Sequence, residues 1–420
     1  MLLGAIADDL TGGTDLALML ARQGMRTVQV VGVPPEDFDF GDAEAVVVAL
    51  KSRTIPAADA VRISLAAARR LTAAGAEQII FKYCSTFDST DAGNIGPVTA
   101  ALLEFLGDSA TIACPAFPAN GRTVFHGHLF VGDLLLSDSP MKDHPLTPMR
   151  DANLVRVLQR QTKLAVGLIP HEIVSKGEEA ISDAFAQAKA EGKKILILDA
   201  TSDVQLLAIG AAASRLKLIT GGAGIAMGLP DNFRSAGKIS GASVQSSFEA
   251  PVGRAVILAG SCSTATRRQV ARAIGAGAPA LQIEPTGIAD GSITVAGVVD
   301  WIRSTDRTPL VYSSADPKDV LEAQASLGRD RAGTLVEDLL AAVAVALRRY
   351  GFSRFLVAGG ETSGAVVNAL DVKALLIGPE IDPGVPWTRS LGSDQPVVLA
   401  LKSGNFGADD FFIKAWDLLQ

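Results

Sequence analysis

The sequence predicts an α/β protein of two domains, each a mostly parallel sheet flanked by helices, with an active-site cleft between the domains. Short, solidly apolar segments such as 46–48 and 195–198 alternate with helical patterns along almost the whole chain. Strands that are apolar on both faces are typical of a parallel sheet covered by helices. The length of 420 residues exceeds that of one ordinary domain. A crevice between two such domains is a usual place for two ligands to meet.

The N-terminal half carries most of the alternation. Its apolar runs predict strands at 2–7, 27–31, 45–50, 78–82, 110–113, 164–168, 194–199 and 216–220. Its helical periodicity predicts helices at 14–23, 57–74, 95–106, 151–161, 177–190 and 202–213. Residues 114–150 are rich in Pro, Gly and His but also apolar, which predicts a hairpin or a binding loop. The glycines of 222–228 are spaced one residue too widely for a dinucleotide fingerprint, so we interpret this segment as a tight packing turn.

Residues 231–253 are rich in Ser, Gly and Ala and predict a linker between the domains. We therefore expect domains at 1–235 and 250–420. In the second domain the pattern predicts strands at 254–259, 279–283, 309–313, 354–358, 373–377 and 397–401. It predicts helices at 264–274, 333–350 and 363–370.

Composition excludes several classes of protein. With 48% hydrophobic residues, 20% charged residues and a formal net charge of −7, the chain is neither disordered nor a candidate for nucleic-acid binding. No apolar run reaches the roughly 18 residues that would span a membrane. Three widely spaced cysteines give neither a disulfide framework nor a zinc pattern, and no secretion signal opens the chain, which favours the cytoplasm. The apolar composition is compatible with a homodimer.

The first strand ends at two adjacent carboxylates, Asp8 and Asp9, followed by two glycines and then Thr14 and Asp15. In open parallel sheets, ligands bind at the carboxyl ends of the strands. Like charges in a crevice repel each other and lose solvation, so paired carboxylates there favour a functional interpretation. The alternative is a solvated turn in which Thr14 or Asp15 caps the helix.

Polar side chains also follow two other strands. Arg53 and Thr54 come after 45–50, and Lys82, Asp88 and Asn94 come after or end 78–82. Cations that bind a carboxylate, next to acids and amides that bind hydroxyls, are suited to a small sugar acid. The start of the helix near Asn94 adds free amide donors.

The histidines of the 114–150 region, His126 and His128, have no third metal ligand in view. A hydrogen-bonding role of His128 toward substrate oxygens is therefore favoured over a metal site. We expect no metal ion held by a set of protein ligands.

The second domain has three loops of small residues after strands, at 260–264, 359–364 and 402–407. Small residues with exposed amides before a helix are a usual cradle for phosphates, and glycine lets the backbone approach the ligand closely. A P-loop is absent, because Gly237 and Lys238 are followed by Ile239. The three loops predict a nucleotide site of another type.

Four motifs together resemble the four-carbon acid sugar kinase family, and most of all its 3-oxo-tetronate kinase branch. They are residues 7–12 (Ala-Asp-Asp-Leu-Thr-Gly), 82–90 (Lys-Tyr-Cys-Ser-Thr-Phe-Asp-Ser-Thr), 93–96 (Gly-Asn-Ile-Gly) and 359–364 (Gly-Gly-Glu-Thr-Ser-Gly). The resemblance covers nearly the whole chain. It implies a sugar-acid-binding N-terminal domain and a nucleotide-binding C-terminal domain.

The resemblance implies ATP-dependent phosphorylation of the terminal hydroxyl of 3-oxo-tetronate (3-dehydro-erythronate) to give the 4-phosphate. The family's nucleotide contacts fall on these positions: Ser261, or Ser263 in its place, then Gly359, Gly360, Glu361, Thr362, Ser363 and Gly404. Mg²⁺ would bridge ATP oxygens.

For the first domain we expect Asp8 or Asp9 to accept or orient the proton of the primary hydroxyl. Arg53 and Lys82 would hold the substrate carboxylate, while Asp88, Asn94 and His128 would contact its hydroxyl and keto groups. A D-threonate or D-erythronate kinase of the same family is one alternative. A nicotinamide-dependent hydroxy-acid dehydrogenase and a non-enzymatic sugar-acid-binding protein are alternatives of other classes.

Overall fold

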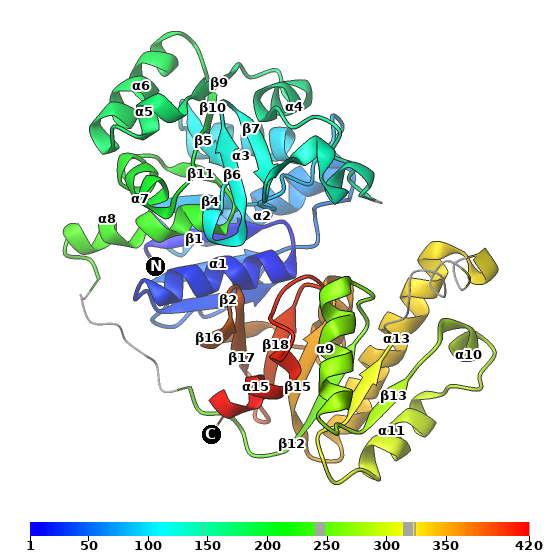
Figure 1. Cartoon of the computed structure of the whole chain (residues 1–420). Coiled ribbons are helices and arrows are strands. Elements are labelled where there is room, and N and C mark those ends of the chain that lie inside the picture. Colours follow the sequence, from blue (N-terminus) through cyan, green and yellow to red (C-terminus); the bar gives the residue numbers. More distant parts are fainter. Residues whose placement is uncertain (145, 240–247, 314–321, 323–324, 420) are drawn as a thin grey trace. The chain divides into compact units, whose positions relative to one another are not determined.

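The structure, a computed structural model, describes residues 1–144, 146–239, 248–313, 322 and 325–419. The chain divides into two compact units, Met1–Gln245 and Ser246–Gln420 (Figure 1). The linker predicted at 231–253 begins too early, because α8 covers Pro230–Ser235. Pro230 is favourable in the first turn of a helix, and Phe233 anchors α8 by burial. Residues 240–247 of the predicted linker lie outside the described residues.

The large sheet of the first unit is parallel throughout. Its strands lie in the order β2-β3-β1-β4-β11-β5-β10-β9. Their bounds are β1 (Leu3–Ala7), β2 (Thr27–Val31), β3 (Ala45–Ala49), β4 (Gln78–Lys82), β5 (Thr111–Cys114), β9 (Val166–Ile169), β10 (Ile195–Leu198) and β11 (Leu218–Gly221). β1 and β3 are buried along their whole length, as solidly apolar strands covered on both faces must be. The α/β prediction is confirmed for this unit.

Helices connect these strands and cover the sheet (Figure 1). They are α1 (Leu10–Arg22), α2 (Ala57–Ala73), α3 (Ile95–Leu106), α4 (Leu154–Gln161), α5 (His171–Val174), α6 (Glu178–Ala190), α7 (Asp203–Ala212) and α8. The predicted bounds of α2, α3, α6 and α7 agree with the observed ones to within one residue, whereas α5 and α8 were not predicted. The largest difference concerns α1, which begins at Leu10 rather than at residue 14 and takes both glycines into its first turns.

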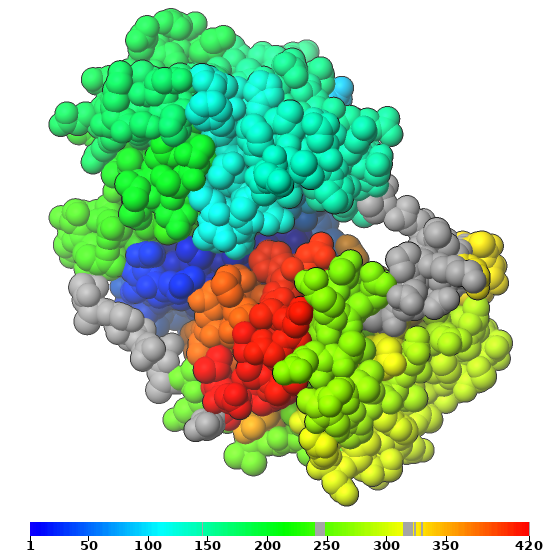
Figure 2. Space-filling view, viewed as in Figure 1, coloured from blue at the N-terminus to red at the C-terminus, as the bar shows by residue number. Residues whose placement is uncertain are grey.

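The region 114–150 forms a small antiparallel sheet of β6 (Arg122–Phe125), β7 (His128–Val131) and β8 (Leu134–Leu135), with short 3₁₀ helices η1 (Pro118–Asn120), η2 (Leu136–Asp138) and η3 (Pro140–Asp143). Figure 2 shows atoms of this region, in cyan, at the surface of the first unit. The hairpin prediction is confirmed. Its two-residue turn has φ of 47° at His126 and 72° at Gly127, the left-handed backbone that such hairpins need.

The segment after β11 is a packing turn, as expected. It forms the 3₁₀ helix η4 (Ala223–Gly228). A Cβ on Gly228 would lie 2.7 Å from the carbonyl oxygen of Leu207, and one on Gly224 would lie 2.6 Å from that of Ala116. The glycines are therefore required for close packing on α7, and they do not frame an open dinucleotide loop.

The second unit has a sheet in the order β13-β14-β12-β15-β18-β17-β16. The first five strands are parallel, whereas β18, β17 and β16 pair antiparallel. Their bounds are β12 (Arg254–Ala259), β13 (Ala280–Gln282), β14 (Leu310–Tyr312), β15 (Phe352–Ala358), β16 (Ala374–Asp382), β17 (Val385–Leu391) and β18 (Val398–Lys402). The mostly parallel sheet is confirmed here too.

The hairpin of β16 and β17 was not predicted in full. The sequence indicated a strand only at 373–377, because Pro379 and Pro386 interrupt the apolar pattern. In the structure β16 continues through Pro379, with irregular register at that point. A parallel sheet thus acquires an antiparallel edge.

The helices of the second unit are α9 (Thr264–Gly275), α10 (Pro285–Ala289), α11 (Val295–Arg303), α13 (Arg329–Arg348), α14 (Gly360–Ala369) and α15 (Phe411–Lys414), followed by the 3₁₀ helix η5 (Ala415–Leu418). The sequence did not predict α10 or α11. The predicted start of α14 at 363 is wrong by three residues, since the helix begins at Gly360. The 359–364 motif is therefore mainly the first turn of a helix.

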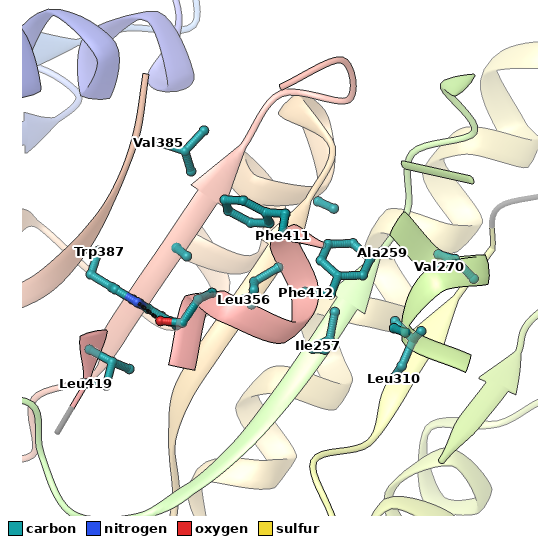
Figure 3. Close-up of a cluster of buried hydrophobic side chains, with 14 of the residues drawn as sticks. Ile257, Ala259, Val270, Leu310, Leu356, Val385, Trp387, Phe411, Phe412 and Leu419 are labelled. Carbon is teal, nitrogen blue, oxygen red and sulfur yellow. Dashed lines mark hydrogen bonds between the residues drawn. The ribbon is translucent and has the colours of Figure 1, made fainter. Parts of the chain in front are cut away.

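A hydrophobic cluster in the second unit holds β12, β15, β17 and β18 against α15 (Figure 3). Trp387 is fully buried, and its indole Nε1 donates to the carbonyl oxygen of Ala415 at 2.8 Å. Phe411 and Phe412 of α15 are buried in the same cluster. This packing fixes the chain that follows β18, including the 403–407 loop.

Candidate functional sites

The first site lies at the carboxyl ends of three neighbouring strands of the first unit. β1 lies between β3 and β4, and Ala7 is in register with both Ala49 and Lys82. Parallel neighbours in this register bring their following residues to one sheet edge. The structure thus places Asp8 and Asp9 beside Arg53 and Lys82, as the sequence predicted.

Asp9 is the N-cap of α1. Its extended backbone (φ −146°, ψ 162°) lets the side chain accept a hydrogen bond from the Gly12 N–H at 3.1 Å. The Thr11 hydroxyl donates to the other carboxylate oxygen at 2.9 Å. The alternative that Thr14 or Asp15 caps the helix is wrong, because both lie inside α1.

Arg53 binds both carboxylates. Its Nε donates to Oδ2 of Asp8 at 2.9 Å and its Nη2 to Oδ1 of Asp8 at 2.8 Å. The same Nη2 donates to Oδ1 of Asp9 at 2.7 Å. Nη1 lies 3.7 Å from Oδ2 of Asp88. One guanidinium therefore organises three carboxylates, and Nη1 has the weakest contact.

Lys82 adds a second buried cation. Its Nζ donates to the carbonyl oxygen of Tyr83 at 3.0 Å. A Cβ on Gly12 would lie 2.8 Å from this Nζ and 2.2 Å from Oδ1 of Asp9. Gly12 therefore leaves the room in which the ammonium group and the Asp9 carboxylate lie close together.

The two aspartates differ in their electrostatics. Burial raises the pKa of the Asp8 carboxyl above its ordinary value, and the charge of Arg53 only partly opposes this. Burial acts on Asp9 too, but the charges of Arg53 and Lys82, with hydrogen bonds from Thr11 and Gly12, lower its pKa. Asp8 is thus the carboxylate that takes up a proton more readily.

Asn94 holds the loop that carries Arg53. Its Nδ2 lies 2.7 Å from the carbonyl oxygen of Ser52, 3.2 Å from that of Arg53 and 3.0 Å from that of Ile55. The side-chain nitrogen is therefore engaged with backbone. Thr54, in the same loop, is exposed.

Asp88 is buried and accepts from the Thr86 hydroxyl at 2.7 Å. His128 lies apart from these contacts: its Nδ1 is 2.9 Å from the carbonyl oxygen of His126, and its Nε2 is 3.3 Å from Nδ2 of Asn153. The structure shows a local role for His128 in the β6–β7 hairpin and no contact that joins it to the carboxylates in the described part of the chain.

The second site lies at the carboxyl edge of the other sheet. β15 lies between β12 and β18, and Ala358 is in register with Ala259 and Lys402. The three loops that the sequence indicated thus begin side by side. The Gly359 N–H donates to the carbonyl oxygen of Lys402 at 2.9 Å, which joins two of them.

Gly260 and Gly359 pack against the start of α14. A Cβ on Gly260 would lie 2.1 Å from Oγ1 of Thr362. Gly359 has φ of 128°, a backbone that favours glycine. The Ser363 N–H donates to the carbonyl oxygen of Gly359 at 2.8 Å, whereas the buried Ser363 hydroxyl has no partner among the described residues.

Gly360 and Glu361 form the first turn of α14. The first N–H groups of a helix have no partner within the helix. A Cβ on Gly360 would meet no atom of the described residues within 4 Å, so the structure shows space beside this turn. This space and these donors suit an anion.

The 402–407 loop approaches the 260–264 loop through Gly404. A Cβ on Gly404 would lie 2.4 Å from Oγ of Ser261 and 3.1 Å from Oγ of Ser263. Ser263 caps α9, accepting from the Thr266 N–H at 3.2 Å. Ser263 therefore has a structural task, and the Ser261 hydroxyl in turn accepts from the Ser263 N–H at 3.2 Å.

The sequence analysis did not select Lys402. Its side chain is fully buried, and Nζ donates to Oγ1 of Thr266 at 3.0 Å and to the carbonyl oxygen of Gly404 at 3.1 Å. Burial lowers the pKa of Lys402 to about 7. The signal that could have indicated Lys402 is its position at the end of an apolar strand, which is also the position of Lys82.

No group of three or more His, Cys, Asp or Glu side chains within the described ranges is arranged to hold a metal ion. Nor does a helix in those ranges combine the length and apolarity needed to cross a membrane.

Two family models match the chain. Residues 3–229 match the sugar-binding N-terminal domain, and residues 256–412 match the nucleotide-binding C-terminal domain. A curated 3-oxo-tetronate kinase from Burkholderia multivorans is 56% identical over 99% of this chain and 96% of its own length. One from Cupriavidus necator is 55% identical with the same shares covered.

Solved structures agree on the fold. A crystal structure of a Salmonella typhimurium LT2 protein has a TM-score of 0.89 at 41% identity, covering 98% of both chains. One from Haemophilus influenzae has a TM-score of 0.82 at 40% identity, covering 99% of this chain and all of that one.

Two α/β units, one with a carboxylate–cation cluster and one with glycine turns at a helix start, together with these relatives, define an enzyme of the kinase class. The chain belongs to the four-carbon acid sugar kinase family, whose two domain models span most of it.

Proposed function

We propose that this kinase transfers the γ-phosphoryl group of ATP to the terminal hydroxyl of 3-oxo-tetronate, giving the 4-phosphate. The observation that carries the proposal is the cluster of buried Asp8 and Lys82 with half-buried Asp9 and Arg53, in a chain that is 56% identical to a curated 3-oxo-tetronate kinase. We place the sugar acid in the first unit and the nucleotide in the second.

In the first unit, Lys82 Nζ and Arg53 Nη1 would bind the substrate carboxylate. Arg53 Nη1 suits this role because its own contact with Asp88, at 3.7 Å, is the longest that the guanidinium makes. Asp88 and His128 stay the predicted contacts of the hydroxyl and keto groups, whereas Asn94, whose Nδ2 is engaged with backbone carbonyls, would act through the loop that it holds.

We assign the general base to Asp8. Three carboxylates (Asp8, Asp9 and Asp88) face two cations (Arg53 and Lys82), which leaves one formal negative charge. That excess and burial both favour proton uptake, and burial raises the pKa of Asp8. Asp9, whose pKa is lowered, would stay ionised and orient the substrate hydroxyl.

In the second unit, the first N–H groups of α14, which have no partner within the helix, and the turns at Gly359 and Gly404 would hold the ATP phosphates. Ser261, Thr362 and Ser363 would supply hydroxyl donors. The orphaned hydroxyl of Ser363 and the open space beside Gly360 fit a ligand of this kind.

Mg²⁺ would arrive with ATP and neutralise charge on the transferring phosphoryl group. Mg²⁺ generally keeps several of its waters and needs few protein carboxylates.

In the proposed step, the substrate hydroxyl oxygen forms a bond to the γ-phosphorus as the bond to the β,γ-bridging oxygen breaks. The hydroxyl proton passes to Asp8, and ADP leaves with the bonding electron pair. The protein's task is alignment, charge neutralisation and exclusion of water. Turnover requires the two ligands to meet.

The test is an ADP-release screen with 3-oxo-tetronate, D-erythronate and D-threonate as acceptors, and mass spectrometry of the product. We expect the highest kcat/KM with 3-oxo-tetronate and a product heavier by one phosphoryl group. A clear preference for D-threonate or D-erythronate would reassign the substrate within the family. If none of the three acids supports ADP release, the proposal is overturned.

A matched pair of variants tests the base. At saturating ATP, Asp8→Asn should lower kcat by roughly 10²–10⁴-fold, the usual contribution of a general base. Asp9→Asn should have the smaller effect on kcat and raise the KM for the acid. If Asp8→Asn keeps a near-normal kcat, the assignment fails.

A further inference from the structure

The carbonyl oxygen of Gly404 accepts hydrogen bonds from three side chains of two elements. The Ser263 hydroxyl lies 2.6 Å away and the Thr266 hydroxyl 2.9 Å away, both from α9 and its cap. Nζ of Lys402 lies 3.1 Å away, from the end of β18. A carbonyl oxygen has two lone pairs, so this one is held unusually firmly toward the interior.

The peptide that follows Gly404 is planar and trans, so its N–H points away from its C=O. That N–H belongs to Asn405, which is exposed. It has no acceptor within the part of the chain that the structure describes. Holding the Gly404 carbonyl inward therefore turns the Asn405 N–H outward.

Lys402 is an uncommon choice for a purely structural donor. Its side chain is fully buried, and the contacts of Nζ among the described residues are with the Thr266 hydroxyl and the Gly404 carbonyl oxygen, neither of which carries a formal charge. A buried ammonium group without a counter-ion is costly to the fold. A bound anion beside the loop would supply the missing negative charge, and burial, which lowers the pKa of Lys402 to about 7, shows how poorly the protein alone stabilises that charge.

We propose that Lys402 is a positioning residue of the nucleotide site: with Ser263 and Thr266 it fixes the Gly404 carbonyl, so that the Asn405 N–H is presented as a donor to the polyphosphate. Lys402 acts through the loop and its charge without contacting the ligand. The inference rests on the proposed function, because it takes ATP and ADP as the anions. It is independent of the identity of the acid.

Calorimetric titration of ATP, ADP and adenosine into Lys402→Met tests the inference. We expect affinity for ATP and ADP to fall about tenfold or more, the usual weight of a charge-assisted contact, and affinity for adenosine to stay unchanged. Lys373→Met is the matched control, since Lys373 is an exposed lysine of the same unit. An equal loss for all three ligands, or none, would overturn the proposal.

Selective ¹⁵N-asparagine labelling reads the geometry directly. The Asn405 amide signal, assigned by its loss in Asn405→Gln, should move when ADP binds to the wild type and should not move in Lys402→Met at saturating ADP. The same shift in both proteins would contradict the proposal.

If Lys402→Met fails to fold, Thr266→Val carries the test, because it removes one donor from the same carbonyl at nearly constant volume. It should weaken ADP binding and leave adenosine binding unchanged, and an unaltered ADP affinity sinks the inference. If the wild type binds no ADP, the proposed function is overturned. If the wild type binds ADP and the variants bind it with the same affinity, only the role of Lys402 is overturned.

Discussion

Arg53 and Asp8 form a two-bond pair, Nε to Oδ2 at 2.9 Å and Nη2 to Oδ1 at 2.8 Å, and the same Nη2 reaches Asp9 at 2.7 Å. Side-by-side donors of a guanidinium match the two oxygens of a carboxylate, which a lysine cannot do. The pair lies at the end of β1, with the Asp8 side chain 8% exposed and that of Arg53 22% exposed. Because the pair is largely buried, we expect it to contribute to the stability of the fold.

Replacing Arg53 by Met should be strongly destabilising. It leaves the buried Asp8 carboxylate and the partly exposed Asp9 carboxylate without their main cation, so we expect the free energy of unfolding at pH 7 to fall by about 3 kcal/mol. Urea unfolding measures the loss. Arg53→Lys keeps a charge but loses the paired geometry. Its free energy of unfolding should lie between those of Arg53→Met and the wild type. Equal stability of Arg53→Met and wild type would show that the pair contributes nothing.

The pH dependence of stability should separate the two aspartates. The pKa of Asp9 is lowered on folding from its ordinary value of 3.8, so its ionisation stabilises the fold above that value. This stability is lost as the pH falls through the folded-state pKa. Asp9→Asn should therefore be less stable than wild type at pH 7, and the difference should shrink below about pH 4.

The pKa of Asp8 is raised on folding, and the sign reverses. The folded state binds this proton more tightly than the unfolded chain, so the contribution of Asp8 declines as the pH rises from 3.8 through its folded-state pKa. Asp8→Asn should thus cost less stability at pH 7 than Asp9→Asn. The urea midpoints of both variants at pH 7 and near pH 3.5 test this prediction. A larger loss of stability at pH 7 for Asp8→Asn than for Asp9→Asn would contradict it.

Much of the fold and of both candidate sites was predictable because strand ends carry their own signal. Apolar strands that stop at Asp8, Lys82 or Gly359 mark the carboxyl edge of a parallel sheet, and adjacency of the strands then brings those residues together. What pattern could not supply is side-chain pairing. Arg53 was expected to bind substrate, yet most of its donors are directed to the protein's own carboxylates.

Other differences have local causes. Asp9 caps α1 although Gly12 and Gly13 follow it, because tight packing beside Lys82 and Gln29 outweighs the low helix propensity of glycine. Lys402 was missed because neither composition nor spacing shows that a side chain at the end of a strand turns inward to a carbonyl.

Asn94 should prove to be a positioning residue for Arg53. Its Nδ2 serves three carbonyl oxygens of the 52–55 loop. Asn94→Ala leaves these buried acceptors unpaired and should cost about 1–3 kcal/mol of stability. Asn94→Asp has nearly the same shape but sets a carboxylate against the carbonyl oxygens, so it should cost more. Thermal melting of the two variants tests the order, and an Asp variant as stable as wild type would exclude this role.

Gly260 should control nucleotide affinity without affecting the acid. A Cβ there would lie 2.1 Å from Oγ1 and 3.2 Å from Cβ of Thr362, so Gly260→Ala must displace the Thr362 side chain in the first turn of α14. We expect the KM for ATP to rise about tenfold, which corresponds to about 1.4 kcal/mol of lost binding, with the KM for the acid within twofold of wild type. Gly275→Ala is the control, because nothing lies within 4 Å of the added methyl. Steady-state kinetics with each substrate varied in turn measures both constants. Equal increases in the two KM values would mean that the units do not divide the substrates, which would contradict the assignment of the nucleotide to the second unit.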